Sequence, residues 1–420
     1  MLASSARRAF ASASSQWGAV SRARRAAWPS VSRSMSVEAK ALTYEKRGET
    51  ITIVEEFSTL SSPSGNQALL KFLAAPITRA DYDVIHASGE SSMSLDIKEV
   101  PVRFAKAQEI GVLDPLAGVV GKLPDLPAVG GLQGVAVVEE VGPAVKGLKP
   151  GDWVIPATGL GTWRSHALLS EDDLAVVPSD IPMEYAAVLS RSPCAALRLL
   201  EDFVALKEGD CILVNACNGL VGQTILQLAA ARGIKAIGIM RGRPGYEEIC
   251  PHLVTLGAAV VVTDAWSKHW QMKDLMAGLP PPKVAFDGAG GNGGAAVANL
   301  LPKGATLVKY GSASQESFRV AAERDIKVET FSLAAWEAAH SKADKEAMLA
   351  QLATMVREKK LQLLLERAFF DRYKTALKMG VEAMRNRQLV MCITEPNWPV
   401  YPEDYWEMDE DAKRLGISVQ

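Results

Sequence analysis

The sequence of 420 residues lacks any uninterrupted apolar run of the roughly 18 residues that a membrane-spanning helix needs. It has only five cysteines, at spacings that fit neither a disulfide framework nor a zinc site. The formal net charge is −2, so there is no basic excess to neutralise nucleic-acid phosphates or an anionic membrane. These absences predict a protein of a reducing compartment, with no transmembrane segment and no nucleic-acid partner.

Acidic side chains are absent from the first 37 residues. This stretch has six arginines among alanines and serines, which is the composition of an organelle transit peptide. We predict a mitochondrial transit peptide at 1–37, cleaved just before Glu38, and a location in the matrix or on the matrix face of a complex. A disordered basic tail is the alternative interpretation.

The pattern of apolar residues changes about halfway along the chain. From Leu42 to Pro178, short β segments are separated by turns. After "PSDIP", strands alternate with helices, which implies a parallel, doubly wound sheet in an α/β protein. The predicted parts are a β-rich domain (38–183 and 331–394), a Rossmann-type domain (184–330) and a C-terminal extension (395–420).

The strongest chemical signal is a buried strand followed by "NACNGLVGQ" and a helix. Glycines at such a turn let the backbone approach a pyrophosphate, and the free N–H groups of the helix attract its charge. The spacing around Gly219 and Gly222 is not the full G-x-G-x-x-G. An ordinary tight turn between a strand and a helix is therefore the alternative.

The next strand ends in "MRGRP". An NAD site usually places an acidic residue here to bind the ribose hydroxyls. Arg241 and Arg243 instead put positive charge where a 2′-phosphate would lie, and either guanidinium can bind it bidentately. This favours NADPH as the cofactor, against the alternative of two solvated surface arginines.

A catalytic zinc would need three converging Cys, His or carboxylate ligands. The turn "VGGLQG" has Leu132 and Gln133 where a His and a Glu would be wanted, and the five histidines share no spacing. We therefore predict no metal site, and chemistry that depends on hydride transfer and on proton donors of the protein.

Several stretches resemble the medium-chain dehydrogenase/reductase superfamily, and within it the mitochondrial trans-2-enoyl-CoA and enoyl-ACP reductases. The similar stretches include "LPDLPAVGG", "GLKPGDWVIPA", "GLGTWRSHALLSEDDL", "NACNGLVGQTILQLAA", "MRGRP" and "LLPKGATLVKYG". They span about Leu42 to Thr394. The resemblance implies a GroES-like catalytic domain, a Rossmann domain and an NADPH cleft between them.

The resemblance also implies, by position, which residues contact the cofactor. They are Ser192, Asn218, Gly219, Leu220, Val221, Gly222, Arg241, Gly242, Arg243, Tyr310, Gly311, Ser312, Ala313, Phe331, Ser332, Leu333, Ala334 and Arg387. Some of them differ in type from the family: Ser192 replaces an Asn, and Ser332 stands where a Trp is usual.

The loop from Gly118 to Gly134 departs further from the family. In the reductases, a tyrosine in this loop is placed to protonate the substrate, and the resemblance puts Val120 at its position. Thr78 stands where the family has an Asn. Loss of a proton donor costs about 10²–10⁴ in rate. Tyr82 or His86 is a candidate replacement, while partial burial as a packing residue is the alternative for Tyr82.

The resemblance implies NADPH-dependent reduction of trans-2-enoyl thioesters in mitochondrial fatty-acid synthesis, with an enoyl thioester or acyl-carrier protein as partner. We expect a homodimer or a subunit of a larger mitochondrial assembly. Two alternatives stay open: an inactive NADPH-binding structural subunit, and a zinc-free quinone or aldehyde reductase. The insertion Ser88–Ala117 and the acidic, aromatic tail after Glu395 favour the structural subunit, because aromatic residues are enriched at interfaces.

Overall fold

The computed structural model describes residues 36–46, 53–86, 124–157, 160–243, 245–311, 315–380 and 387–395. Residues 36–420 form one unit of mutual contacts, so the boundaries predicted between its two domains stay predictions. The first strand begins at Val37, one residue before the predicted start of the mature chain. Among the described helices, none has the length and apolar character to cross a bilayer.

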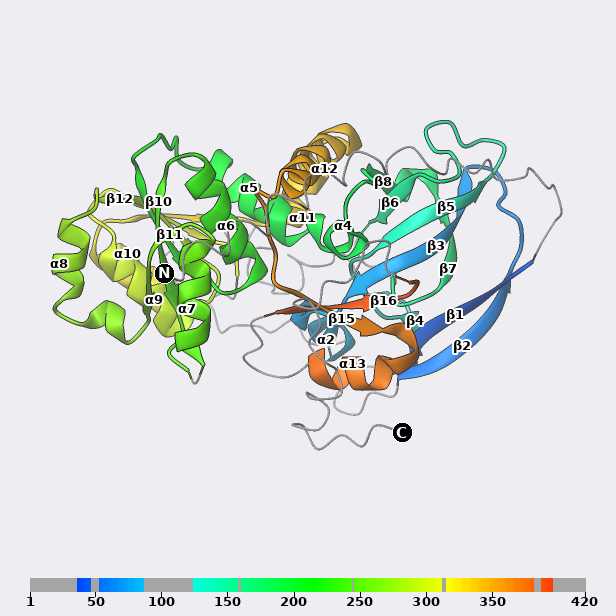
Figure 1. The fold of residues 1–420 in the computed structure, drawn as a ribbon, viewed down its shortest axis with the longest axis horizontal. Coiled ribbons are helices and arrows are strands. Elements are labelled where there is room, and N and C mark those ends of the chain that lie inside the picture. The colour runs from blue at the N-terminus through cyan, green and yellow to red at the C-terminus, as the bar shows by residue number, and fades with distance from the viewer. Residues whose placement is uncertain are drawn as a thin grey trace, which may run out of the picture. The chain divides into compact units, whose positions relative to one another are not determined.

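Two sheets, mostly antiparallel, make up the β-rich part of the described chain (Figure 1). The smaller sheet has the order β2 (Ile53–Leu60), β1 (Val37–Tyr44), β4 (Ala128–Val129). The larger has the order β15 (Leu365–Phe369), β16 (Gln388–Cys392), β3 (Gln67–Pro76), β5 (Val135–Val141), β6 (Trp153–Pro156), β8 (Leu174–Val177), and β7 (His166–Ser170) pairs with β3. Only β15 and β16 among these described strands pair in parallel.

A parallel sheet forms the second part. Its order in the described residues is β11 (Ala258–Thr263), β10 (Lys235–Met240), β9 (Cys211–Asn215), β12 (Pro282–Asp287), β13 (Thr306–Lys309), β14 (Lys327–Thr330). The strand order reverses between β9 and β12, which is the switch point where ligands bind in doubly wound folds. The predicted fold class, a β-rich domain plus a Rossmann-type parallel sheet, is confirmed.

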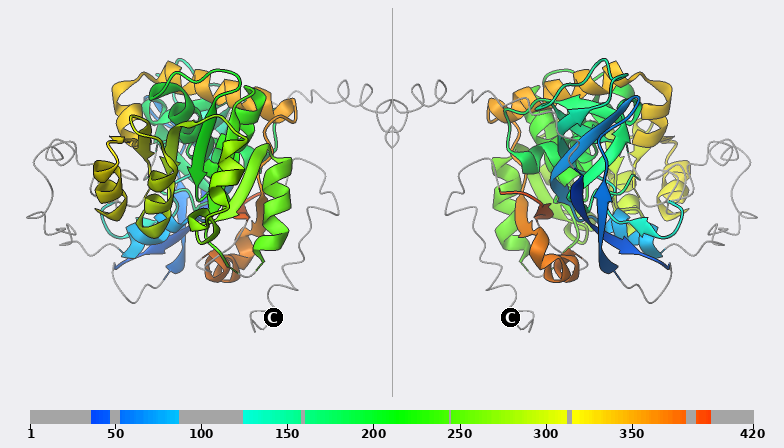
Figure 2. Two further views of the ribbon diagram at one scale, coloured as in Figure 1. Left: turned by 90° about the vertical axis from the view of Figure 1, so that its left-hand side faces the viewer. Right: turned by 90° about the vertical axis from the view of Figure 1, so that its right-hand side faces the viewer.

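The described helices are α2 (Arg79–His86), α4 (Met183–Leu189), α5 (Ser192–Asp202), α6 (Leu220–Ala231), α7 (Tyr246–Thr255), α8 (Met272–Ala277), α9 (Gly291–Leu300), α10 (Gln315–Glu323), α11 (Leu333–Ala339), α12 (Lys342–Arg357) and α13 (Tyr373–Gly380). Short 3₁₀ helices are η4 (Glu171–Asp173), η5 (Trp266–Lys268) and η6 (Phe370–Arg372). Figures 1 and 2 show helices on both faces of the parallel sheet.

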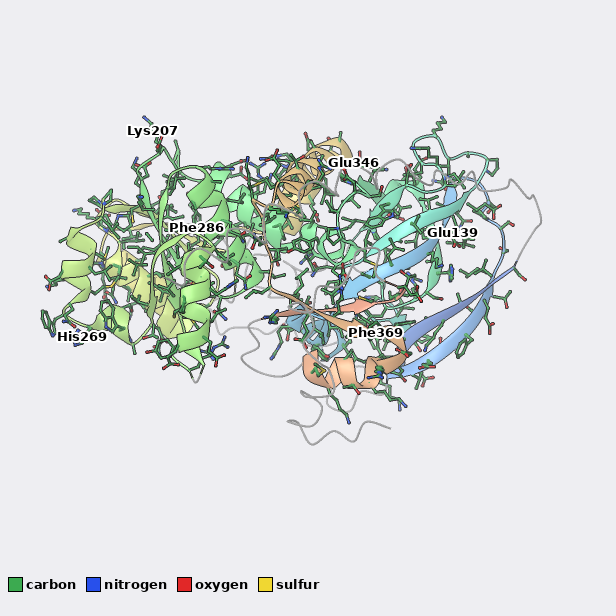
Figure 3. All side chains as sticks on the ribbon, in the orientation of Figure 1. Glu139, Lys207, His269, Phe286, Glu346 and Phe369 are labelled. Atoms are coloured by element: carbon green, nitrogen blue, oxygen red, sulfur yellow. The ribbon has the colours of Figure 1, made fainter. Side chains whose placement is uncertain are left out.

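Strand β9 shows why this sheet needs helices on both faces. Ile212 and Val214 join a core with α5 and α6, whereas Leu213 between them joins a second core with α9 and α10. Successive residues of a strand point to opposite faces, so a strand covered on both sides must be apolar throughout. Phe286 of β12 lies inside the same layered core (Figure 3).

Side-chain amides of α6 connect the parallel sheet to the chain that returns to β15. Gln227 donates from Nε2 to the carbonyl of Gln362 at 2.7 Å, and its Oε1 accepts from the Gln362 N–H at 2.7 Å. Gln223 Oε1 accepts from the Leu364 N–H at 3.3 Å. These bonds fix the helix that follows the glycine turn against the β-rich part.

The segment "AVGG" packs on the fully buried Trp163. A Cβ added at Gly130 would lie 2.4 Å from Trp163 Cε3, and Gly131 has a φ of +89°. Both positions therefore require glycine. The end of the proline- and glycine-rich loop thus serves to cover a core tryptophan.

Candidate functional site

The carboxyl ends of the parallel strands gather most of the predicted cofactor residues at one edge of the sheet. Ile239 of β10 lies beside Asn215 of β9, and Lys309 of β13 lies beside Asp287 of β12. The predicted segments follow β9, β10, β13 and the neighbouring β14. The structure brings together Asn218, Gly219, Leu220, Val221, Gly222, Arg241, Gly242, Arg243, Tyr310, Gly311, Phe331, Ser332, Leu333 and Ala334. Ser312 and Ala313 lie outside the described residues.

The turn after β9 lets a ligand approach the backbone at the start of α6 closely. Ala216 has a φ of +48°, and the Gly219 N–H donates to the Ala216 carbonyl at 2.9 Å. A Cβ added at Gly222 would lie 2.5 Å from Cys217 Cα, so only glycine lets α6 start this near the turn. No side chain caps the helix at Gly219. Its first N–H groups are therefore available to an anion such as phosphate.

The arginines after β10 differ in environment. Arg241 is exposed and forms no ion pair with a carboxylate that the structure describes. Arg243 is half-buried, and burial together with the charge of Arg241 lowers the pKa of its guanidinium. Asp264 accepts from the Gly242 N–H at 3.0 Å and so fixes the turn between them.

The remaining predicted contacts occupy mixed positions. Ser192 is the half-buried first residue of α5. Phe331 packs edge-on against Phe203, with ring centroids 6.1 Å apart. Ser332 caps α11 by accepting from the Ala335 N–H at 3.3 Å, while Leu333 is buried. Arg387 lies near His252 of α7. Burial lowers the pKa of His252, and the charge of Arg387 adds a smaller lowering.

A buried polar network at the switch point was missed by the sequence analysis. Asp287 is 0% and Lys309 4% exposed, and Asp287 Oδ2 lies 3.9 Å from Lys309 Nζ. Asn215 donates from Nδ2 to Asp287 Oδ1 at 2.6 Å, and its Oδ1 accepts from the Gly288 N–H at 2.7 Å. These three residues are the polar ends of "CILVN", "KVAFD" and "TLVK", which is the signal that could have identified them.

Thr78 belongs to a second buried cluster, at the start of α2. Its N–H and its hydroxyl both donate to Asp81 Oδ2 at 2.6 Å, and Leu132 N–H donates to Asp81 Oδ1 at 2.8 Å. Asp81 is 2% exposed, and this burial raises the pKa of its carboxyl to about 6, although the three hydrogen bonds and Arg191 act against the rise. Asp81 thus joins the Thr78 turn to the "GGLQG" turn.

Tyr82 lies in the core between α2 and α13. Its hydroxyl donates to the carbonyl of Leu377 at 2.5 Å, and its side chain packs with Ile77 and Met379. Burial, with a smaller contribution from Asp81, raises the pKa of Tyr82. These contacts favour the packing interpretation of Tyr82 over proton donation.

Other residues singled out from the sequence lie outside the described part. Val120, the insertion Ser88–Ala117 and the tail after Glu395 belong to this group, as does the side chain of His86. Leu132, which stands where a zinc-binding His would be wanted, is buried. Among the described residues, no three His, Cys, Asp or Glu side chains cluster as a metal site would need.

The β-rich sheets and the parallel sheet with its switch point form the two-part fold that the sequence resemblance implied. No family model matches the sequence. The human protein "Enoyl-[acyl-carrier-protein] reductase, mitochondrial" is 36% identical over 328 residues, which cover 77% of this chain and 80% of the human one. The chain therefore belongs to the family of mitochondrial enoyl-[acyl-carrier-protein] reductases, and the predicted resemblance is confirmed. The mitochondrial location predicted from the leader agrees with this family.

Two solved structures show the same fold. The Etr1p/NADP/crotonyl-CoA complex has a TM-score of 0.69 at 21% identity, covering 85% of this chain and 100% of that one. A quinone oxidoreductase of Pseudomonas syringae has a TM-score of 0.65 at 21% identity, covering 84% and 100%. Because these two structures are of different proteins, the fold alone does not select an activity.

Asp81 should make stability depend on pH. Its folded-state pKa of about 6 lies above the ordinary 3.8, so its contribution to the free energy of unfolding is present at low pH and is lost as the pH rises through 6. We expect urea denaturation to show a gain in stability between pH 7 and pH 5 that exceeds the gain in Asp81→Asn. Parallel pH profiles of the two proteins would contradict this assignment.

Substitutions of Asp287 and Lys309, which form a buried pair, should have non-additive effects on the free energy of unfolding. Asp287→Asn leaves the Lys309 ammonium buried without this carboxylate, and we expect a loss of about 3–5 kcal/mol in the free energy of unfolding. The double variant Asp287→Asn/Lys309→Met removes both charges and should lose less. Lys303→Met, in an exposed pair with Asp325, is the control and should cost under about 1 kcal/mol in urea denaturation. Additive losses in the double variant would exclude the coupling.

Proposed function

We propose that this protein is an NADPH-dependent reductase of trans-2-enoyl thioesters in mitochondrial fatty-acid synthesis. We place it in the matrix or on the matrix face of a complex. One observation carries the proposal. This chain, which belongs to the reductase family, has its uncapped glycine turn and its two arginines at the same edge of the parallel sheet.

The chain's residues fit the cofactor. The close approach at Gly222 and the free N–H groups at the start of α6 suit the pyrophosphate. Arg241 is exposed at the end of β10, where the 2′-phosphate of NADPH would lie and an NAD site would have an acidic residue. Tyr310, Gly311 and the segment from Phe331 to Ala334 would bound the same site.

When bound, NADPH supplies the hydride that adds to the β-carbon of the enoyl thioester. The chain then has to place the substrate and allow a proton to reach its α-carbon. The Thr78 hydroxyl already donates to Asp81, and the Tyr82 hydroxyl donates to Leu377. We therefore propose that solvent supplies the proton and that turnover is about 10²–10⁴ slower than with a positioned donor.

Because the hydroxyls of Thr78 and Tyr82 already donate hydrogen bonds within the protein, they also favour a second function. A chain that binds NADPH, carries Val120 at the tyrosine position and has no replacement donor in Thr78 or Tyr82 could serve as a structural subunit. Assembly partners would then use the insertion Ser88–Ala117 or the C-terminal tail.

Val120→Tyr separates the two functions. With the chain that starts at Glu38 and a trans-2-enoyl-CoA, we expect slow NADPH oxidation by the natural protein and a rise of up to about 10²–10⁴ in the variant. Val120→Phe, which has the ring but no hydroxyl, should show no such rise. NADPH binding without oxidation in all three proteins would exclude the reductase and leave the structural subunit.

The Arg241→Ala variant tests whether the protein prefers NADPH to NADH. Loss of a charged hydrogen bond to the 2′-phosphate should weaken NADPH about 10- to 100-fold and leave NADH almost unchanged. Titration of cofactor binding by tryptophan fluorescence measures both constants. Lys235→Ala, at the opposite end of β10, is the matched control and should change neither. Equal weakening of NADPH and NADH in Arg241→Ala would refute the assignment.

A further inference from the structure

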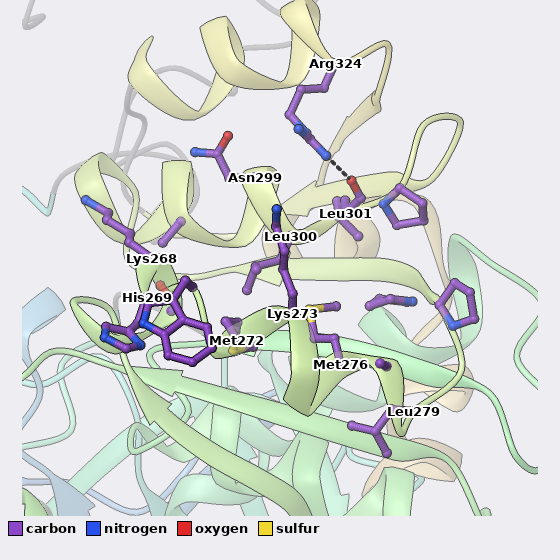
Figure 4. A pocket seen from close by; sticks show the side chains of 17 residues that line it. Lys268, His269, Met272, Lys273, Met276, Leu279, Asn299, Leu300, Leu301 and Arg324 are labelled. Atoms are coloured by element: carbon purple, nitrogen blue, oxygen red, sulfur yellow. Dashed lines mark hydrogen bonds between the residues drawn. The ribbon is translucent and has the colours of Figure 1, made fainter.

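A hollow of about 880 Å³ is lined mainly by η5, α8 and the second half of α9 (Figure 4). Pro282, the first residue of β12, and Leu301, just before β13, both line it. Ser267 and Lys268 of η5, shortly after the end of β11, line it as well. We call it the basic groove.

The floor of the basic groove is apolar and adaptable. Met272 and Met276 of α8 lie there with Leu279 and Leu300. Methionine side chains are flexible and polarizable, and they suit surfaces that accept an aromatic residue. Trp270 at the rim is 68% exposed, more than any other large hydrophobic side chain in the described part of the chain.

The rim of the groove carries charge of one sign. Lys268 lies in η5, Lys273 lies in α8 and Arg324 directly follows α10, and none of the 17 lining residues is acidic. Arg324 donates from Nη2 to the Leu301 carbonyl at 2.9 Å, which holds it beside the groove. None of the three cations forms an ion pair with a described carboxylate. The groove therefore suits an acidic ligand with an aromatic centre.

The chain itself contains such a segment. Residues 403–411, "EDYWEMDED", have six acidic residues among nine and no basic one, and Tyr405 and Trp406 are flanked by acids on both sides. We propose that the basic groove binds residues 403–411 of a second copy of this chain. Trp406 packs on the methionine floor, and the carboxylates around it pair with Lys268, Lys273 and Arg324.

Reach favours a second copy over the groove of the same chain. The eleven Cα–Cα steps from Glu395 to Trp406 extend at most about 40 Å. A folded unit of 385 residues has a radius of gyration of about 21 Å and hence a diameter near 54 Å. Glu395 follows β16 of the β-rich sheet, whereas the groove lies at α8, at the far side of the parallel sheet (Figure 1).

The test uses a labelled peptide of residues 400–413 and the protein without residues 396–420. We expect saturable binding that weakens with salt and is about tenfold weaker in Lys268→Glu/Lys273→Glu. The control Lys374→Glu/Lys378→Glu makes the same charge change on exposed α13 and should bind normally. A peptide whose acidic residues are replaced by lysine should bind the Lys268→Glu/Lys273→Glu variant, in which the charge of the groove is reversed. Such binding would also show that this variant is folded.

Competition identifies the occupant. The full-length chain with the reversed groove still has a tail, so it should displace the peptide from the truncated protein. Failure to displace it, or no peptide binding by the truncated protein, would overturn the proposal. A full-length natural protein that excludes the peptide at every dilution would also overturn it, because its own tail would then fill its groove.

Discussion

The side-chain amide of Asn215 lies between two strands at the switch point, and the geometry of the carboxyl edge of the sheet depends on its hydrogen bonds. It donates to Asp287 and accepts from the N–H of Gly288, so it joins β9 to the turn after β12. Gly290 N–H also donates to Asp287, at 2.8 Å. Lys309 balances the carboxylate from the next strand. Because a buried charge is costly unless it is paired and hydrogen-bonded, these strand ends are held in one arrangement.

The fold, and the gathering of the predicted segments at one edge of the parallel sheet, could be predicted because their signals are local or periodic. An apolar run such as "CILV" followed by a glycine turn predicts a strand covered on both faces, and parallel strands necessarily end at one edge. The position of Arg241 follows from the same rule. Residues that follow strands are therefore placed together by topology, without knowledge of any contact.

The unpredicted features depend on partners that are distant in the sequence. Asn215 and Asp287 are 72 residues apart, and the strand register alone makes them neighbours. The interpretation of Tyr82 depends on the carbonyl of Leu377, 295 residues away. Thr78 is a local case, since its partner Asp81 is three residues on, but Asp81 also accepts from the N–H of Leu132, 51 residues away.

The two candidate sites on the parallel sheet differ in their sources of positive charge. At the carboxyl edge, backbone N–H groups of α6 supply it together with Arg241 and Arg243, and a glycine turn brings the N–H groups near a ligand. In the basic groove, flexible side chains supply it around an apolar floor. Backbone donors are fixed in place and suit a small ligand that must be held in register, whereas lysine side chains adjust to a peptide and are screened by salt. In a chain with 48 acidic residues, a surface lined by cations and no acid is set apart by charge from the rest of the molecule. If both proposals hold, one sheet presents a rigid ligand site and an adaptable contact surface.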